Sequence, residues 1–390
     1  MAKRDLFKLP GIQDLSKDQE DGRALPKNGQ HLIIGGPGTG KSVLALLRAR
    51  RHHEDDEDYV FLIYNHLLNQ ASCLLFGKAL SSKQWMSWFM STFRKMTGEP
   101  FPTLPPRSGS TWKEIDWDGG LAIIGDQSLP SVNGFPYLVI DEGQDMPPQF
   151  YQALANLGFE NFFVVADQNQ QIVPDKNSTR RDIENVLAID TADVIELQDN
   201  YRNSHAIARL ARCFYTGDPA SPPPKLPVAV ATASKRPMLV DYQPDAFQKI
   251  IGRILKISDN DRSKLIGVIA PNNKVRERYF KELMNANVEL VNGRPNITTF
   301  ASGDGHEMAF DEGGVMVINA QACKGLEFDT VVLADIDKYH CNPKNQNAVR
   351  RLFYVMVARA IDQVIMLKEA GSHCPVDAIL PKEPDVLERK

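Results

Sequence analysis

The segment GGPGTGKS, residues 35–42, is the feature that most restricts the fold of this chain. It fits the pattern G-x-x-x-x-G-K-[ST], follows the apolar run HLII and precedes a helical segment at residues 41–53. Its glycines let backbone N–H groups turn toward phosphate oxygens, and the start of a helix adds partial positive charge. The sequence therefore predicts a phosphate-binding loop between a buried strand and a helix.

Two side chains of this loop have predicted roles in binding a nucleoside triphosphate. Lys41 is expected to reach the β- and γ-phosphates, and the Ser42 hydroxyl is expected to ligate Mg²⁺. A Gly-rich turn that binds nothing is the ordinary alternative. The other candidate nucleotide-binding residues are Gly35, Gly36, Pro37, Gly38, Thr39 and Gly40.

Short apolar runs of strand length recur along the chain. They lie at residues 31–36, 59–64, 137–141, 162–167 and 193–197, and again at 237–242, 265–271, 315–319, 330–335 and 363–368. Continuous apolarity without alternation is typical of parallel strands buried on both faces. Helical segments lie between several runs, so the sequence predicts an α/β fold with two lobes. The Pro- and Gly-rich stretches at 100–136 and 216–227 are predicted to be loops or connectors.

An acidic segment, YLVIDEGQD at residues 137–145, follows one of these predicted strands. A carboxylate at the tip of a parallel strand next to a phosphate loop can hold Mg²⁺, and the following residue can orient or deprotonate the attacking water. We assign the metal to Asp141 and the water to Glu142. An acidic loop after an edge strand is the alternative.

Composition limits the class of protein further. The 390 residues carry 45 Lys and Arg against 49 Asp and Glu, a formal charge of −4, so the chain is no global polycation of the kind that indicates nucleic-acid binding, and a local basic groove stays open as an alternative. No apolar run reaches the ~20 residues of a membrane span, and the N-terminus lacks an apolar signal segment. Five scattered cysteines without a CxxC pair argue against a disulfide framework and a zinc ribbon. We expect a cytoplasmic protein that does not bind membranes.

The acidic segment resembles the D-E-x-Q-D motif of the UvrD/Rep-type helicases of superfamily 1. Gln144 and Asp145 complete that motif and are more than a minimal ATPase needs. Other segments resemble further motifs of that family in the same order. They are DLSKDQ at 14–19, VVADQNQQI at 164–172, LQDNYRNSHAI at 197–207, and the segments at 267–283, 321–335 and 350–360.

This resemblance implies roles for six more residues. They are Gln19 on the adenine edge, Gln170 as γ-phosphate sensor, Tyr201 stacked on adenine, Arg202 on the γ-phosphate, Glu327 on the ribose and Arg359 as second arginine finger. Positive charge on the γ-phosphate oxygens supports phosphoryl transfer, and arginines from a second lobe would make hydrolysis depend on lobe closure. The ordinary alternatives are a surface ion pair for Arg202 and a helix C-terminal contact for Arg359.

The resemblance also implies two RecA-like lobes with mainly parallel sheets and the nucleotide in the interlobe cleft. We place the lobes at residues 1–195 and 196–390, so that both arginines come from the second. Larger relatives carry an accessory domain in each lobe. Here the corresponding gaps, 97–136 and 283–314, are too short for a domain. The chain is similar to a minimal motor core, so autonomous unwinding of a duplex is not expected from the resemblance.

Contacts with nucleic acid are harder to predict. The segment at 84–98 interleaves aromatic and basic residues, a mixture that stacks bases and follows phosphates. Its Trp85, Trp88, Phe89 and Thr92 also have helical spacing, which is equally typical of a core-facing helix. Residues 64–70 and the basic segment 274–281 are further candidates, the second also explained as a solvated helix face.

The leading hypothesis is an ATP-dependent motor on single-stranded DNA that hydrolyses ATP to ADP and phosphate with Mg²⁺. The resemblance implies 3′ to 5′ movement and favours DNA over RNA. A second hypothesis is an ATP-gated regulatory subunit that controls a partner protein, such as a nuclease or a repair or defence factor, without processive unwinding. A P-loop kinase or metabolic ATPase is the third and is disfavoured by the ordered arginine and glutamine motifs.

Overall fold

The computed structural model of the chain describes residues 15–63, 82–106, 113–126, 134–167, 169, 177–217, 222–227, 235–300 and 313–390. Their Cα atoms group into two compact units. The N-terminal unit comprises residues 15–35 and 40–197, and the C-terminal unit comprises residues 36–39 and 198–390. The domain boundary placed after residue 195 stays a prediction.

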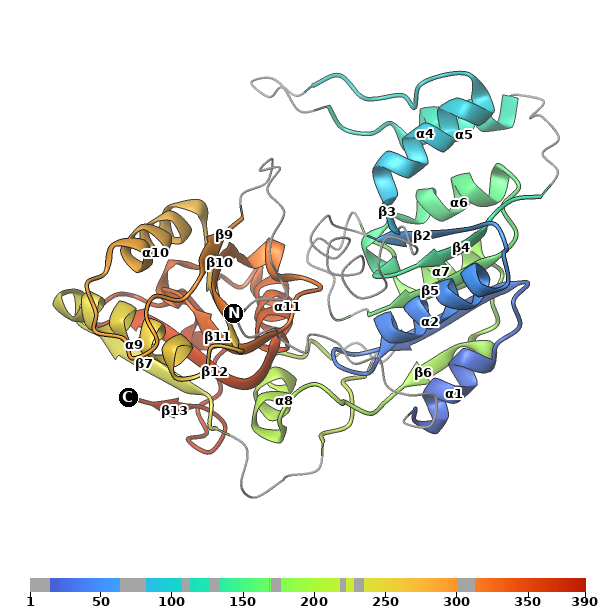
Figure 1. The fold of residues 1–390 in the computed structure, drawn as a ribbon. Coiled ribbons are helices and arrows are strands. Elements are labelled where there is room, and N and C mark those ends of the chain that lie inside the picture. Colours follow the sequence, from blue (N-terminus) through green and yellow to red (C-terminus); the bar gives the residue numbers. More distant parts are fainter. Residues whose placement is uncertain are drawn as a thin grey trace. The chain divides into compact units, whose positions relative to one another are not determined.

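A six-stranded sheet forms the centre of the N-terminal unit (Figure 1). Its order is β3-β2-β4-β5-β1-β6, and its neighbouring strands are parallel. The strands are β1 (Gln30–Gly35), β2 (Tyr59–Ile63), β3 (Ser82–Gln84), β4 (Tyr137–Ile140), β5 (Phe162–Ala166) and β6 (Ile195–Leu197). Successive side chains alternate between two hydrophobic clusters, as Leu32 and Ile33 do. The predicted parallel sheet is confirmed.

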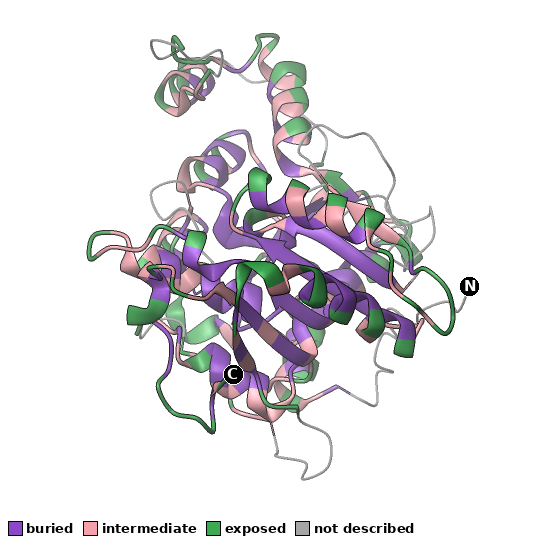
Figure 2. Ribbon diagram, turned by 90° about the vertical axis from the view of Figure 1, so that its left-hand side faces the viewer, coloured by how far each residue is buried: buried purple, intermediate pink, exposed green. Residues whose placement is uncertain are grey.

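Helices cover both faces of this sheet. On one face α2 (Lys41–Glu54) packs Leu44 and Ala49 onto the strands, beside α1 (Lys17–Ala24). The core on the other face is completed by α4 (Trp85–Thr97), α5 (Trp117–Asp126), α6 (Pro148–Asn156) and α7 (Arg180–Val186). Figure 2 shows the strands as the buried centre of the fold. Burial on both faces is why these strands read as unbroken apolar runs.

The aromatic residues of segment 84–98 belong to this core. Trp85, Phe89 and Phe93 are buried on one side of α4, while Arg94 and Lys95 are exposed. The core-facing alternative is therefore confirmed for Trp85 and Phe89, and Trp88 is half-buried against the same core. A contact between the two basic residues and nucleic acid stays a prediction, and the candidate segment 64–70 lies outside the described residues.

The segment 100–136 contains a helix where the sequence predicts only a connector. Helix α5 forms because Trp117 and the buried Ile124 pack toward Phe101, whose ring centroid lies 5.2 Å from that of Trp117. Gly120 leaves the room for this packing, since a Cβ there would lie 2.2 Å from the Phe101 ring. The prediction was wrong because the Gly content that suggests a loop serves close packing here.

A seven-stranded sheet forms the centre of the C-terminal unit. Its order is β13-β7-β12-β11-β8-β10-β9, and its neighbouring strands are also parallel. The strands are β7 (Met238–Tyr242), β8 (Leu265–Ala270), β9 (Ile297–Thr299), β10 (Gly314–Asn319), β11 (Phe328–Leu333), β12 (Ala360–Glu369) and β13 (Glu388–Arg389). All five apolar runs of the second half are strands, which confirms two α/β lobes.

Four helices flank the C-terminal sheet. α9 (Phe247–Asn260) and α10 (Asn273–Asn285) pack together over β8, β9 and β10. α8 (His205–Arg212) and α11 (Gln346–Val357) pack together beside β11 and β12. Figure 1 shows these two helix pairs on opposite sides of the sheet. Each lobe is therefore a three-layer α/β structure.

Membrane insertion and disulfide bonding can be checked on the described residues. No helix in these ranges combines the length and the apolarity needed to cross a bilayer. Cys213, Cys323, Cys341 and Cys374 are free thiols. Burial raises the pKa of the Cys323 thiol to about 12, so this cysteine stays protonated in its buried position.

The packing of Gly267 yields a stability prediction. A Cβ at this position of β8 would lie 2.6 Å from the fully buried ring of Phe328. Gly267→Ala should therefore destabilise the C-terminal unit by about 1–3 kcal/mol through overpacking. The measurement is the midpoint of urea unfolding.

Gly252→Ala in α9 is the matched control. Its Cβ would meet Val288 at 3.4 Å, an ordinary contact, and alanine favours a helix by roughly 0.5–1 kcal/mol over glycine. The control should leave the midpoint unchanged or raise it. Equal midpoints for Gly267→Ala and wild type would contradict the packing described here.

Candidate functional site

The loop between β1 and α2 has the backbone that the phosphate-binding pattern requires. Gly38 and Gly40 adopt left-handed conformations, with φ of 74° and 88°, which favour glycine. The Thr39 hydroxyl donates a hydrogen bond to the Gly36 carbonyl at 2.8 Å. Lys41 is the first residue of α2 and is buried, with its Nζ 3.7 Å from Asp167 Oδ2. The helix N-terminus and the Lys41 ammonium thus favour an anion at the same place.

Asp141 lies directly after β4 and next to Ser42. Its Oδ1 accepts a hydrogen bond from the Glu142 N–H at 2.9 Å, and its carboxylate is hydrogen-bonded to Ser42. Burial, together with the charge of Glu142, raises the pKa of Asp141 to about 6, whereas the Ser42 hydrogen bond and Lys41 act in the opposite direction. The two predicted Mg²⁺ ligands are therefore neighbours, and both offer oxygen atoms, the donor type that Mg²⁺ takes.

Glu142 is held in an unusual backbone conformation. Its φ is 54° and its ψ is 41°, a left-handed conformation that costs energy for a residue with a Cβ. The side chain is buried, and Oε2 accepts a hydrogen bond from Gln144 Nε2 at 2.6 Å. The Tyr151 hydroxyl, which donates to the Gly143 carbonyl at 2.7 Å, fixes the next residue of the turn. The fold thus orients the Glu142 carboxylate at the strand end.

Gln144 joins the acidic segment to the end of β5. While its Nε2 donates to Glu142, its Oε1 accepts a hydrogen bond from the Asp167 N–H at 2.8 Å. Asp167 in turn pairs with Lys41. Because β4, β5 and β1 are adjacent and parallel, their carboxyl ends meet at one edge of the sheet. A connected set of buried polar side chains therefore runs from Glu142 through Gln144 and Asp167 to Lys41.

Gln19 also lies against the phosphate-binding loop. Its Oε1 accepts a hydrogen bond from the Ser16 N–H at 3.0 Å, and Ser16 Oγ accepts one from the Gln19 N–H at 3.3 Å, a capping box at the start of α1. A Cβ on Gly40 would lie 2.4 Å from Gln19 Nε2. Gln19 is thus buried beside the loop, and its role in reading adenine stays a prediction.

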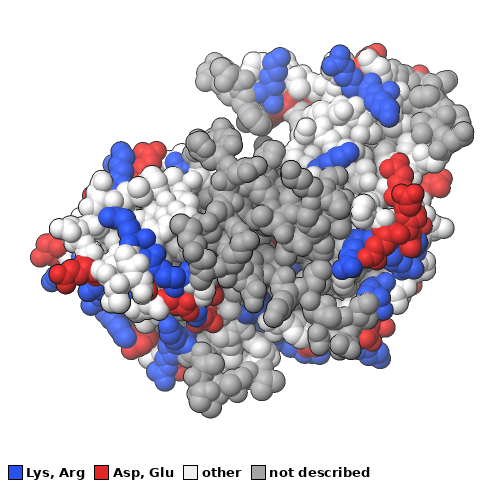
Figure 3. Space-filling model, viewed as in Figure 1, with Lys and Arg blue, Asp and Glu red and all other residues white. Residues whose placement is uncertain are grey.

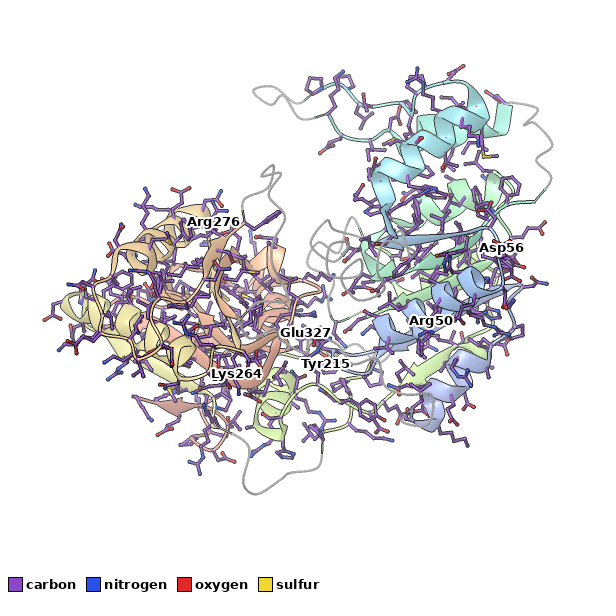
Figure 4. The ribbon with its side chains drawn as sticks, in the orientation of Figure 1. Arg50, Asp56, Tyr215, Lys264, Arg276 and Glu327 are labelled. Carbon is purple, nitrogen blue, oxygen red and sulfur yellow. The ribbon has the colours of Figure 1, made fainter. Side chains whose placement is uncertain are left out.

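Three predicted nucleotide contacts lie in the C-terminal unit. Arg202 forms an ion pair with Glu327, which is labelled in Figure 4. The Tyr201 side chain is 58% exposed, and its N–H donates to the Gly38 carbonyl at 2.8 Å. The ion pair is of the kind that the ordinary alternative for Arg202 describes, so the roles of these residues toward a nucleotide stay predictions.

Arg359 lies just after Ala358, the C-cap of α11, and is buried. Its Nε donates to the Val355 carbonyl at 3.2 Å, a helix C-terminal contact of the kind that the ordinary alternative describes. Asn203 fixes the backbone around it, since Nδ2 donates to the carbonyls of Ala358 at 3.1 Å and Ala360 at 2.6 Å. The structure thereby brings the segments of Arg202 and Arg359 together.

The sequence did not predict two residues of the candidate site, Asp167 beside Lys41 and Asn203 beside Arg359. Asp167 ends an apolar strand next to those of Asp141 and the loop, so its position after β5 was a usable signal. Asn203 gave no such signal, because nothing in its sequence context shows which carbonyls its amide meets. Gln170, the predicted γ-phosphate sensor, lies outside the described residues.

The central place of Gln144 leads to a second stability prediction. Gln144→Leu should destabilise the N-terminal unit by about 1–3 kcal/mol, because the Glu142 carboxylate and the Asp167 N–H lose buried hydrogen bonds. Urea unfolding measures the loss. Gln248→Leu is the matched control, since Gln248 makes an exposed hydrogen bond to Glu282, and its effect should stay within about 0.5 kcal/mol. Equal losses of unfolding free energy in Gln144→Leu and Gln248→Leu would contradict the buried hydrogen bonds described for Gln144.

Comparison with known proteins adds one family match. Residues 314–367, from β10 to β12, match the family described as UvrD-like helicase C-terminal domain. Among curated proteins, none matches the chain. The match covers a small part of the chain, and this part contains Glu327 and Arg359.

Solved structures resemble the fold over almost the whole length. Dbp5 from S. cerevisiae, bound to RNA and ADP BeF3, has a TM-score of 0.53 at 12% identity, covering 97% of this chain and 90% of that one. A point variant of Dbp5, also bound to RNA and ADP BeF3, has a TM-score of 0.51 with the same identity and coverage. The C-terminal domain of a possible DNA helicase from Lactobacillus plantarum has a TM-score of 0.33 at 17% identity, over 48% of this chain and 97% of that one. The two α/β lobes of this chain thus have the RecA-like fold of helicase cores.

Proposed function

We propose that this protein is an ATP-dependent motor that moves on single-stranded DNA and hydrolyses ATP to ADP and phosphate. The observation that carries the proposal is the connected set of Lys41, Asp167, Gln144 and Glu142 beside the glycine-rich loop. A loop that only binds phosphate needs the lysine and the helix N-terminus. A buried carboxylate oriented by an amide beside the loop is what hydrolysis needs in addition.

In this proposal the N-terminal unit supplies the chemistry. Ser42 and Asp141 would hold Mg²⁺, which neutralises phosphate charge when bound. Lys41 binds the β- and γ-phosphates, and the loop N–H groups surround them. Glu142 orients the attacking water and accepts its proton on the carboxylate that Gln144 holds.

The C-terminal unit supplies positive charge and contacts to the nucleoside. Arg202 and Arg359 are proposed to stabilise the γ-phosphate oxygens, with Tyr201 on the adenine ring and Glu327 on the ribose. Binding of a nucleotide would then have to replace the ion pair between Arg202 and Glu327. Gln19 and Gln170 complete the proposed site at the adenine edge and the γ-phosphate.

We further infer that the chain is a UvrD/Rep-type core with lobes at 1–195 and 196–390 and without large accessory insertions. The match at residues 314–367 supports this reading, and the RecA-like fold is consistent with it. On the face seen in Figure 3, the described basic and acidic side chains both occur on the surface, so contact with a DNA strand there would depend on local groups and stacking. A cytoplasmic location and a protein partner, such as a nuclease or a repair or defence factor, are part of the proposal.

ATP turnover of the purified protein tests the proposal. A single-stranded DNA oligonucleotide should raise turnover several-fold, and an RNA of the same sequence should raise it less. Lys41→Ala and Glu142→Gln should each lower DNA-stimulated turnover by about 10²-fold or more, because each removes a group that acts on the transferred phosphate or the water. Glu142→Gln should still bind a fluorescent ATP analogue, since it keeps the loop and Lys41.

Two surface variants serve as controls. Lys249→Ala and Glu54→Gln change exposed residues of α9 and α2 and should leave turnover unchanged. If the protein binds ATP but neither DNA nor RNA changes its ATP turnover, the result would contradict the motor function and favour the ATP-gated regulator. Turnover that requires a small phosphoacceptor would contradict both.

The direction of movement is a separate prediction. A motor that moves 3′ to 5′ should displace streptavidin from a biotin at the 5′ end of a single strand, and should do so only with hydrolysable ATP. A biotin at the 3′ end is the control, from which displacement should not exceed the spontaneous rate. Faster displacement from the 3′ end would reverse the assigned direction.

A further inference from the structure

The C-terminal unit contains a cavity of about 350 Å³ between α9 and the sheet. This lies at the lower end of the roughly 300–1,000 Å³ of ligand pockets. Its walls come from β7, β11, β12 and α9 and are mostly apolar. The lining residues are Met238, Val240, Ile250, Arg253, Ile254, Lys256, Ile257, Asn260, Val332, Gln363, Ile365 and Leu367. None of these residues belongs to the candidate nucleotide site.

The cavity exists because one part of the sheet is incompletely covered. α9 and α10 lie over β8, β9 and β10. β7 and β12 lie on the other side of β11 in the strand order, away from these three strands. Met238 pairs with Ile365, and Val240 pairs with Leu367, so these side chains share one face. Met238, Val240 and Ile365 remain half-buried, whereas all six residues of β8 in the same sheet are buried. The floor of the cavity is therefore apolar surface that can accept a further apolar group.

One amide group inside the cavity has no hydrogen-bond partner. Gln363 lines the cavity, and its side chain makes no hydrogen bond within the described ranges. An amide that lines the cavity can exchange hydrogen bonds with water for hydrogen bonds with a bound ligand. Because the amide offers both a donor and an acceptor, it matches the N–H and C=O of a peptide backbone.

Two basic residues stand at the rim. Arg253 and Lys256 are three residues apart on α9, both are exposed, and neither forms an ion pair with any residue that the structure describes. Two acidic residues beside the lining residues on β7 and β12 are paired with other lysines. Asp362 lies 2.5 Å from the Nζ of Lys264, which Figure 4 labels, and Asp241 lies 3.5 Å from Lys368 Nζ. The rim therefore carries uncompensated positive charge.

We propose that this cavity docks a peptide segment of a partner protein, with an apolar side chain flanked by acidic residues. The apolar side chain fills the floor over Met238, Val240 and Ile365. The peptide backbone pairs with the Gln363 amide, and the acidic residues face Arg253 and Lys256. Charge complementarity and the unpaired amide together favour a peptide over a purely apolar ligand.

A peptide-display selection on the full-length protein tests this proposal. A random peptide library is first depleted on the double variant Arg253→Glu/Lys256→Glu and then selected on the wild-type protein. Both substitutions are at exposed positions and should leave the fold intact. The enriched peptides should combine a large apolar residue with neighbouring Asp or Glu. By fluorescence polarisation, the double variant should weaken their binding by at least about tenfold, and added salt should weaken it further.

Two more variants separate the site from general effects. Gln363→Leu should weaken peptide binding several-fold without lowering the urea midpoint, since its amide has no partner in the protein. Lys249→Glu, on the same helix but outside the cavity, should bind like wild type. Peptides without acidic residues, or equal binding to the double variant, would overturn the proposal. Displacement of the enriched peptides by decanoate, with decanoate itself binding more tightly, would assign the cavity to a small amphiphile instead.

Discussion

Lys41, Asp167, Gln144 and Glu142 are buried together at the edge of the N-terminal sheet, where an ion pair and two hydrogen bonds connect them. A buried charge without a partner costs several kcal/mol, and the contacts within this set offset part of that cost for the lysine and the two carboxylates. The strand order provides the set, because β4, β5 and β1 are adjacent and end at the same edge. The proposed roles of Lys41 and Glu142 in hydrolysis depend on this arrangement of three strand ends.

The sheets were predictable from sequence to a large extent. Runs such as YVFLIY and LIGVIAP are apolar throughout because both faces of each strand are covered, and this pattern leaves few other structures open. The short strands β3, β9 and β13 were not predictable, since two or three residues carry no periodic pattern and pair only because a neighbour is present. Helix α5 escaped prediction for a related reason, as Gly120 supports the packing of Phe101 across the chain.

The candidate site also has one part that was predictable from sequence and another part that was not. The loop, Ser42, Asp141 and Glu142 follow from local patterns, because their spacing relative to strands and helices fixes where they lie. The left-handed backbone of Glu142 and the two-sided hydrogen bonding of Gln144 depend on Asp167 and Tyr151, which are distant in sequence. Arg202 and Arg359 could be named from motifs, but their contacts with Glu327 and Val355 required the fold.

The hydrogen bonds of the Asn203 side chain limit how the C-terminal unit can change shape. Its amide ties the turn that carries Arg202 to both carbonyls beside Arg359, and Asn200 Nδ2 holds Asn203 Oδ1 at 2.9 Å. A shift of either segment relative to the other would therefore break hydrogen bonds of the buried Asn203 amide. In evolutionary terms such a link makes the two segments epistatic, so that a change tolerated in one depends on the residue present in the other.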